Sequence, residues 1–148
     1  MKARYLGHVV FYVKDLERSL AFYRDLLGFT EVGRVFNGAA AALTSGRTHH
    51  ELLLIQVGEA PGPMTGQRRG LYHIGIKVGD SLDELRAAKR ELELAGVEIE
   101  GMSDHTVSQS LYLRDPDGNE VELYVDADEA IWKNDPAAAL SPIKPLRL

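Results

Sequence analysis

Apolar and polar residues alternate along several short stretches of the chain, and two longer stretches instead repeat apolar residues at helical spacing. Period two is typical of a half-buried strand, and a spacing of three and four residues is typical of an amphipathic helix. Each helical stretch follows a strand-like stretch that opens on a histidine, His8 or His73. An aspartate stands seven positions after each histidine, at Asp15 and Asp80. The same signals therefore occur twice in the same order.

The helix boundaries also recur. Asp15 can cap the start of the first helical stretch, which reaches Gly28. The second stretch begins with Ser81 and Glu84, whose side chains can satisfy backbone amides at a helix start, and it stops at Gly96. Three strand candidates follow each helix: residues 29–35, 39–44 and 51–57, and residues 97–100, 108–114 and 120–125. This order predicts an α+β fold of two tandem βαβββ modules, the alternative being a chance likeness between two strand–helix starts.

A stretch rich in glycine and proline separates the two halves. The length of 148 residues suits a single domain, and we interpret residues 1–148 as one domain. Its first module covers about residues 4–58, and a linker covers residues 59–70. The second module covers about residues 71–126, and residues 127–148 form a C-terminal tail.

Net charge, apolar runs and cysteine content exclude several kinds of partner and of metal site. The formal net charge of -5 argues against nucleic acid as a partner. No apolar run approaches the ~20 residues of a membrane span, and the first residues lack a signal-peptide core, so we expect a cytoplasmic protein without membrane contact. The chain has no cysteine, which excludes disulfides and thiolate metal sites. A metal would need histidine and carboxylate ligands.

Alternation sorts each strand into an apolar set, expected to pack against the helices, and a second set on the opposite face. His8, His73, Glu122 and Tyr112 all fall in the second set. A solvated face would also be polar, but it would more naturally hold lysine, glutamate and threonine than two histidines at equivalent positions. Two imidazoles and a carboxylate are the ligand set of non-haem Fe(II) oxygenases, and Zn, Mn, Ni or Co can use the same groups. The residues thus predict a metal site without choosing the metal.

Three motifs, "GHVVFYVKDLERSLAFYRDLLGF", "YHIGIKV" and "DPDGNEVELY", resemble the vicinal oxygen chelate superfamily. That superfamily includes glyoxalase I, methylmalonyl-CoA epimerase, extradiol dioxygenases, and the fosfomycin and bleomycin resistance proteins. The resemblance covers about residues 4–126. It implies a cup-shaped mixed sheet with the helices outside, around a metal held by His8, His73 and Glu122.

Within the superfamily, "SDHTVSQSLYLRDPDGNEVELY" is most similar to the catechol-type extradiol dioxygenases. His105 matches their D-H-x-V-S histidine, Tyr112 stands ten residues before Glu122, and His50 lies in "HH" before an acidic residue. The resemblance implies His50 as the acid–base group and His105 and Tyr112 as donors to the substrate oxygens. It also implies Fe(II), an aromatic diol with O₂ as substrates, and a homodimer or higher homo-oligomer. The alternatives are that His105 caps a loop and that Tyr112 is an aromatic at the core edge.

Two features, the chain length and Glu51, differ from the pattern of the catechol-type extradiol dioxygenases. Many extradiol enzymes have about twice this length with a second, metal-free domain, so substrate contacts from such a domain would be missing here or would come from another subunit. Glyoxalase I adds a glutamate ligand at or next to Glu51, which makes a glyoxalase-like or epimerase-like metalloenzyme the rival interpretation. A drug-sequestering resistance protein of the same fold is a third alternative, although the intact ligand set argues against it.

The stretch "HHELLLIQV" decides between His50 and Glu51 by the face that each occupies. Alternation groups Glu51 with Leu53, Ile55 and Val57, and groups His50 with Leu52, Leu54 and Gln56. The first group is the more apolar, so we expect it to face the helix and expect His50 to face the cup. A bulge at His49 would invert this assignment.

Overall fold

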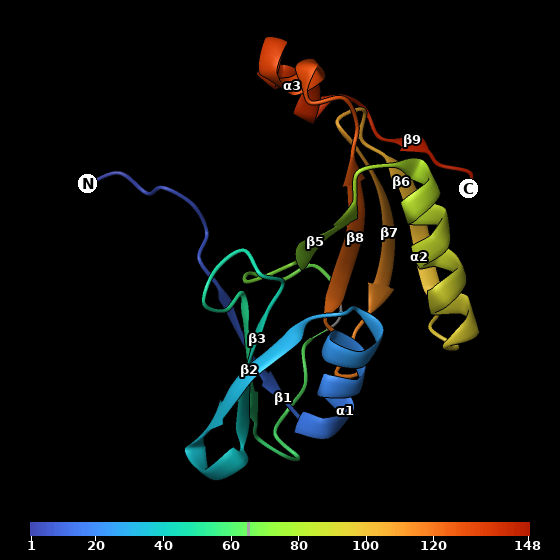
Figure 1. The fold of residues 1–148 in the computed structure, drawn as a ribbon. Helices are drawn as coiled ribbons and strands as arrows, with labels where there is room; N and C mark the ends of the chain where they lie inside the picture. Colours follow the sequence, from blue (N-terminus) through green and yellow to red (C-terminus); the bar gives the residue numbers. More distant parts are fainter. Residues whose placement is uncertain (65) are drawn as a thin grey trace. The chain divides into compact units, whose positions relative to one another are not determined.

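The computed structural model describes residues 1–64 and 66–148. The chain forms two compact units, unit 1 (Met1–Met64) and unit 2 (Thr65–Leu148), each with its own sheet. Figure 1 shows the elements of both. Along the described residues, no helix has both the length and the apolar character needed to cross a membrane.

Unit 1 is a four-stranded mixed sheet with one helical segment between its first two strands. The strand order is β1-β4-β3-β2, in which β1 and β4 are parallel and the other pairs are antiparallel. Its elements are β1 (Val9–Val13), α1 (Leu16–Leu20), the π-helical segment η1 (Ala21–Leu26), β2 (Thr30–Val35), the 3₁₀ turn η2 (Phe36–Gly38), β3 (Ala40–Thr44) and β4 (Leu52–Gln56).

The start of α1 follows directly from the sequence. Asp15 has an extended backbone, and its carboxylate accepts a hydrogen bond from the Arg18 amide at 2.8 Å, as predicted for a helix cap. The helix then widens into η1 rather than continuing as a regular α-helix. Phe11 and Val13 of β1 are buried, and so is Leu20 of α1. The apolar set of β1 therefore faces the core of unit 1, as alternation predicted.

Unit 2 repeats the arrangement with a longer helix. Its sheet has the order β5-β8-β7-β6-β9, in which β5 and β8 are parallel and the other pairs are antiparallel. Its elements are β5 (His73–Gly79), α2 (Leu82–Leu94), β6 (Ile99–Asp104), β7 (Ser108–Arg114), β8 (Glu120–Asp126), α3 (Ala130–Asn134), η3 (Pro136–Leu140) and β9 (Lys144–Pro145).

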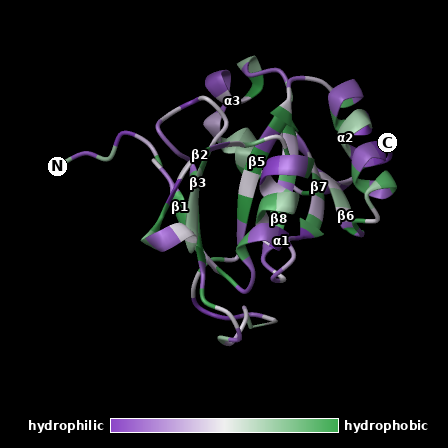
Figure 2. Ribbon diagram, turned by 60° about the horizontal axis from the view of Figure 1, so that its bottom comes forward, coloured by the Kyte–Doolittle hydropathy of each residue, from purple (hydrophilic) through white to green (hydrophobic). Residues whose placement is uncertain are grey.

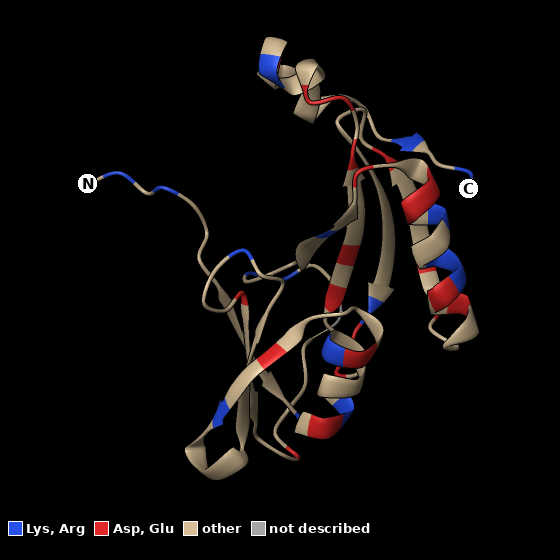
Figure 3. Ribbon diagram, viewed as in Figure 1, with Lys and Arg blue, Asp and Glu red and all other residues tan. Residues whose placement is uncertain are grey.

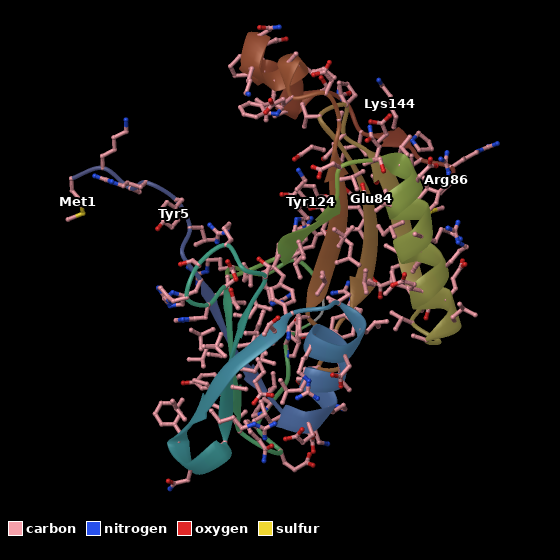
Figure 4. The ribbon with its side chains drawn as sticks, viewed as in Figure 1. Met1, Tyr5, Glu84, Arg86, Tyr124 and Lys144 are labelled. Carbon is pink, nitrogen blue, oxygen red and sulfur yellow. The ribbon has the colours of Figure 1, made fainter. Side chains whose placement is uncertain are left out.

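The predicted serine–glutamate cap opens α2. Ser81 Oγ accepts from the Glu84 amide at 3.3 Å, and Glu84 Oε2 accepts from the Asp80 amide at 2.8 Å. Figure 4 labels Glu84 at this end of α2. Leu85 and Leu92 are the buried residues of the helix, and hydrophilic and hydrophobic residues mix along α2 in Figure 2. The apolar stripe of α2 thus packs on strands β5, β7 and β8.

The structure confirms the α+β class and the two tandem βαβββ modules. It differs in the second module, where β6 begins at Ile99 and runs on to Asp104, because β7 pairs with it along that length. The predicted tail also has structure, since β9 pairs with Ser103 and Asp104 of β6. The predicted linker, residues 59–70, includes Thr65, which lies outside the described residues.

Candidate metal centre

His73 and Glu122 lie together on the sheet of unit 2. They come from the parallel neighbours β5 and β8, in which Gly75 is the register partner of Glu122. His73 Nε2 lies 3.1 Å from Glu122 Oε2. A parallel pair therefore brings together two side chains that stand far apart in the sequence and that were predicted as metal ligands.

Gly75 keeps the neighbourhood of this pair open. A Cβ atom at this position would lie 3.4 Å from Cε1 of Tyr124 and 3.7 Å from Oε2 of Glu122. Both distances are ordinary van der Waals contacts, so a methyl group fits, whereas a longer side chain would extend over the carboxylate. The glycine thus leaves space at the oxygen atom that faces His73.

The other oxygen of Glu122 is held by two hydroxyl groups of β7. Ser110 Oγ donates to Glu122 Oε1 at 2.6 Å, and Tyr112 Oη donates to the same atom at 3.1 Å. His105 Nε2 lies 2.6 Å from Tyr112 Oη. Because the tyrosine proton points to the carboxylate, we assign the proton of His105 to Nε2, which then donates to the tyrosine. The result is a chain of hydrogen bonds from His105 to Glu122.

The hairpin between β7 and β8 explains this register. Asp115 begins the "DPDGN" turn, and its Oδ1 accepts from the amides of Asp117 at 2.9 Å and Asn119 at 2.8 Å. The turn sets Tyr112 directly opposite Glu122 in the antiparallel pair. Figure 3 shows the acidic positions along β8.

Burial raises the pKa of Tyr112 to about 12, and the negative charge of Glu122 adds to the effect. The phenol is therefore neutral at physiological pH and available as a donor. Ser110 was not among the predicted site residues. Its signal was its parity with Tyr112 on β7, which places both hydroxyl groups on one face.

Three histidines gather in unit 1. The ring centroid of His8 lies 4.6 Å from that of His50, and the centroids of His49 and His50 are 4.4 Å apart. The two Nδ1 atoms of His49 and His50 are 2.6 Å apart, so one of them donates to the other. Burial lowers the pKa of His50, and the neighbouring charges of His49 and His8 lower it further. His50 is therefore a neutral imidazole at neutral pH.

Glu51 is engaged within its own loop. Its Oε2 accepts from the Ser45 amide at 2.8 Å, and its Oε1 accepts from the Thr48 amide at 3.0 Å. Burial would raise the pKa of Glu51, but these hydrogen bonds and the nearby Arg47 outweigh it, so the pKa is lowered. The carboxylate closes the loop that precedes β4.

The predicted faces of β4 were wrong. Leu52 and Leu54 are buried, and Gln56 Oε1 accepts from the Leu16 amide at the start of α1. This set, assigned by alternation to the cup, therefore faces the helix. The reason is the parallel pairing, which sets Leu54 beside the buried Phe11 of β1. The prediction placed the set with Gln56 away from the helix because that set is the less apolar. Gln56 nevertheless lies on the helix side, where it accepts from a helix amide.

The position of His50 is consequently not set by strand alternation. The strand begins only at Leu52, and His50 lies in the loop before it. The Glu51 carbonyl still accepts from the Val9 amide at 2.9 Å, which ties this loop to β1. The ring of His50 reaches His8 from the loop, while Glu51 turns back toward Ser45.

The predicted ligands divide between the units, with His8 in unit 1 and His73 and Glu122 in unit 2. Among the described residues, no three His, Asp or Glu side chains are arranged so that they could hold a metal ion, and this includes the three histidines of unit 1. The pair in unit 2 nevertheless fits one, because an imidazole nitrogen and a carboxylate oxygen converge and the second carboxylate oxygen is already oriented by hydroxyl groups. The full set of three ligands stays a prediction.

Residues 5–123 match the family described as the Glyoxalase/Bleomycin resistance protein/Dioxygenase superfamily. The catechol-2,3-dioxygenase of Bacillus subtilis (strain 168) is 35% identical over 134 residues, covering 88% of this chain and 45% of that protein. Biphenyl-2,3-diol 1,2-dioxygenase 3 of Rhodococcus globerulus is 34% identical over 128 residues, covering 82% of this chain and 63% of that protein. A glyoxalase/dioxygenase structure from Nostoc punctiforme has a TM-score of 0.72 at 21% identity, covering 84% of this chain and 92% of that chain.

The chain belongs to this superfamily, also called the vicinal oxygen chelate superfamily, as its motifs predicted. The likeness to the Nostoc structure shows only a shared fold, because the sequence identity is low. The chain spans about half of the length of the Bacillus relative and less than two thirds of the Rhodococcus relative.

Proposed function

We propose that this chain is an Fe(II)-dependent extradiol dioxygenase that cleaves the ring of a catechol-type aromatic diol with O₂. Two curated relatives named for dioxygenases of such diols support the substrate class. The proposal goes beyond the family, which also includes glyoxalases and resistance proteins.

One observation carries the choice of reaction. His50 lies beside the predicted ligand His8, whereas the carboxylate of Glu51 is held by the amides of Ser45 and Thr48. A dioxygenase needs an acid–base group near the metal, and a glyoxalase needs a fourth carboxylate ligand. The arrangement supports the first, because both carboxylate oxygens of Glu51 already accept from loop amides, and turning them toward a metal would weaken these hydrogen bonds.

His8, His73 and Glu122 would hold the metal. When bound, the metal would supply open positions for substrate and O₂ and the capacity to pass charge between them. Ser110 would orient Glu122 by its hydrogen bond to Oε1. The proposal requires that His8 meet the pair of unit 2, either within one chain or between two copies in a homo-oligomer.

The remaining site residues would handle protons and the diol. Nδ1 of His50 is hydrogen-bonded to Nδ1 of His49, so Nε2 is the nitrogen that would take up and return a proton. An imidazole suits this role because its unperturbed pKa is about 6.5. Tyr112 and His105 would hold the diol oxygens, since both stand in the hydrogen-bond chain that ends at Glu122.

A glyoxalase I-like metalloenzyme is the second candidate. The observation that favours it is the pairing of β1 with β4, in which Val9 opposes Leu52. If this register continued one residue back, Glu51 would share a face with His8. Such an enzyme would use Zn, Ni or Co and a carboxylate base, without O₂.

Anaerobic reconstitution with Fe(II) tests the proposal. We expect oxygen uptake on addition of a catechol, with a yellow ring-fission product in the visible spectrum. The control is the same protein loaded with Ni(II) or Zn(II) and given methylglyoxal with a thiol. Turnover in the control, together with no oxygen uptake with any catechol, would replace the dioxygenase by the glyoxalase-like enzyme.

A further inference from the structure

Glu120 is a buried carboxylate for which the proposed reaction has no role. It opens β8, and only 8% of its surface is exposed. An ionised carboxylate is costly to bury unless it is paired and hydrogen-bonded. The partners of its two oxygen atoms should therefore indicate why it lies there.

The two oxygens of Glu120 face the two neighbouring strands. Oε2 accepts from Nη2 of Arg114 at 3.0 Å, on the β7 side. Oε1 lies 3.3 Å from Nδ1 of His73, on the β5 side. Both contacts follow from the register, because His73 and Arg114 are the pairing partners of Glu120 on the two strands.

His73 is thus flanked by a carboxylate at each ring nitrogen. Glu122 Oε2 lies 3.1 Å from Nε2, and Glu120 Oε1 lies on the Nδ1 side. Nδ1 is buried and has no aligned hydrogen bond among the described residues. Glu120 is close enough to accept one after a small rotation of either side chain. A buried polar atom without a partner is costly, and this contact would satisfy it.

We propose that Glu120 is a positioning residue for His73: its carboxylate keeps the imidazole proton on Nδ1, so that Nε2 presents its lone pair on the side of Glu122. A metal-binding histidine generally donates its other N–H to such a partner, which fixes the tautomer and ring orientation. The inference rests on the proposed function only in taking His73 as a metal ligand.

Arg114 keeps Glu120 in place. Its Nε donates to the Glu100 carboxylate at 3.0 and 3.1 Å, and its Nη1 donates to the Gly118 carbonyl at 3.4 Å. The guanidinium is therefore anchored through Nε and Nη1 while its Nη2 holds Glu120. This anchoring orients the Glu120 carboxylate between Arg114 and His73, with Oε1 on the side of Nδ1.

Glu100 offers a matched control, because it is bound to the same arginine, and among the described residues no hydrogen bond or ion pair joins it to His73. The test is calorimetric titration of the metal-free full chain with Zn(II) alone, for wild type, E120L, E120Q and E100Q. We expect E120L to lose about 10–100-fold in metal affinity. E120Q should lose less, because its amide oxygen can accept from Nδ1, and E100Q should match the wild type.

The tautomer gives a second readout. In ¹⁵N NMR of the Zn(II)-loaded wild type, His73 should carry its proton on Nδ1, and E120L should lose this single protonated form. An equal loss of affinity in E120L and E100Q would overturn the proposal, because it would reduce Glu120 to a support of Arg114. Unchanged affinity in E120L, or no metal binding by the wild type, would overturn it as well. If the variants show the expected metal affinities but the protein cleaves no catechol, the role of Glu120 stands and the proposed dioxygenase function is wrong.

Discussion

Tyr112 and Glu122 are direct partners in the antiparallel pair of β7 and β8, and the tyrosine hydroxyl donates to Glu122 Oε1 at 3.1 Å. The same hydroxyl lies 2.6 Å from His105 Nε2. A predicted metal ligand is therefore connected to two predicted substrate-binding groups by continuous hydrogen bonds. The contact makes the site of unit 2 testable by single substitutions.

Tyr112→Phe removes the hydroxyl while keeping the ring. We expect metal content to stay near that of the wild type, because Ser110 still donates to Glu122. Catechol turnover should fall about 10–100-fold, which corresponds to the loss of a hydrogen bond with a charged partner. Oxygen-electrode kinetics and metal analysis measure the two quantities. Ser110→Ala is the matched control, since it removes the other donor to the same oxygen, and an equal loss of turnover in both variants would contradict a direct role for Tyr112.

His50→Ala tests the acid–base assignment. The metal should remain bound, and turnover should fall about 10²–10⁴-fold, the usual contribution of general acid–base catalysis. His49→Ala serves as the comparison, because His49 contacts His50 Nδ1 without being assigned to the reaction. Loss of metal from the His50 variant would make His50 a ligand instead.

Glu51→Gln separates the two candidate reactions. We expect the metal to stay, because the carboxylate is engaged with the amides of Ser45 and Thr48. The variant should lose about 1–3 kcal/mol of unfolding free energy at pH 7, the cost of disrupting hydrogen bonds to a charged group. Urea unfolding and metal analysis measure the two effects. A stable variant without metal would identify Glu51 as a ligand and favour the glyoxalase-like enzyme.

The stability effect of Glu51 should also depend on pH. Its pKa is lower in the folded protein than the ordinary value of 4.5, so the ionised form stabilises the fold at higher pH. The difference in unfolding free energy between wild type and Glu51→Gln should be complete at pH values above 4.5. It should shrink as the pH falls below 4.5 and through the folded-state pKa. A difference that grows on acidification would contradict the hydrogen-bonded carboxylate.

Gly75 tests the space beside Glu122. Gly75→Ala adds a methyl group at ordinary contact distances from Tyr124 and Glu122, so we expect wild-type stability and turnover. Gly75→Leu would extend over the carboxylate, and we expect weaker metal binding and a higher KM for catechol. Calorimetric metal titration and steady-state kinetics check both variants. Full activity of Gly75→Leu would show that the space serves neither metal nor substrate.

The sequence by itself determined the two βαβββ modules, the helix caps at Asp15 and Ser81, and the shared sheet face of Tyr112 and Glu122. These features depend on neighbours within a few residues, where periodicity, caps and turn residues act directly. Gln56 shares the face of the buried Leu52 and Leu54, as strand alternation requires, although its polarity suggested the opposite face.

Only the tertiary structure decided which face of β4 is buried, that Glu51 closes a loop, and that Glu120 contacts the predicted ligand His73. Each of these depends on which strand lies beside which, and in what register. Register places Leu54 next to Phe11, and it places Glu120 between His73 and Arg114. A polar residue can pair with any suitable partner, so its role follows from the neighbour that folding supplies rather than from its own chemistry.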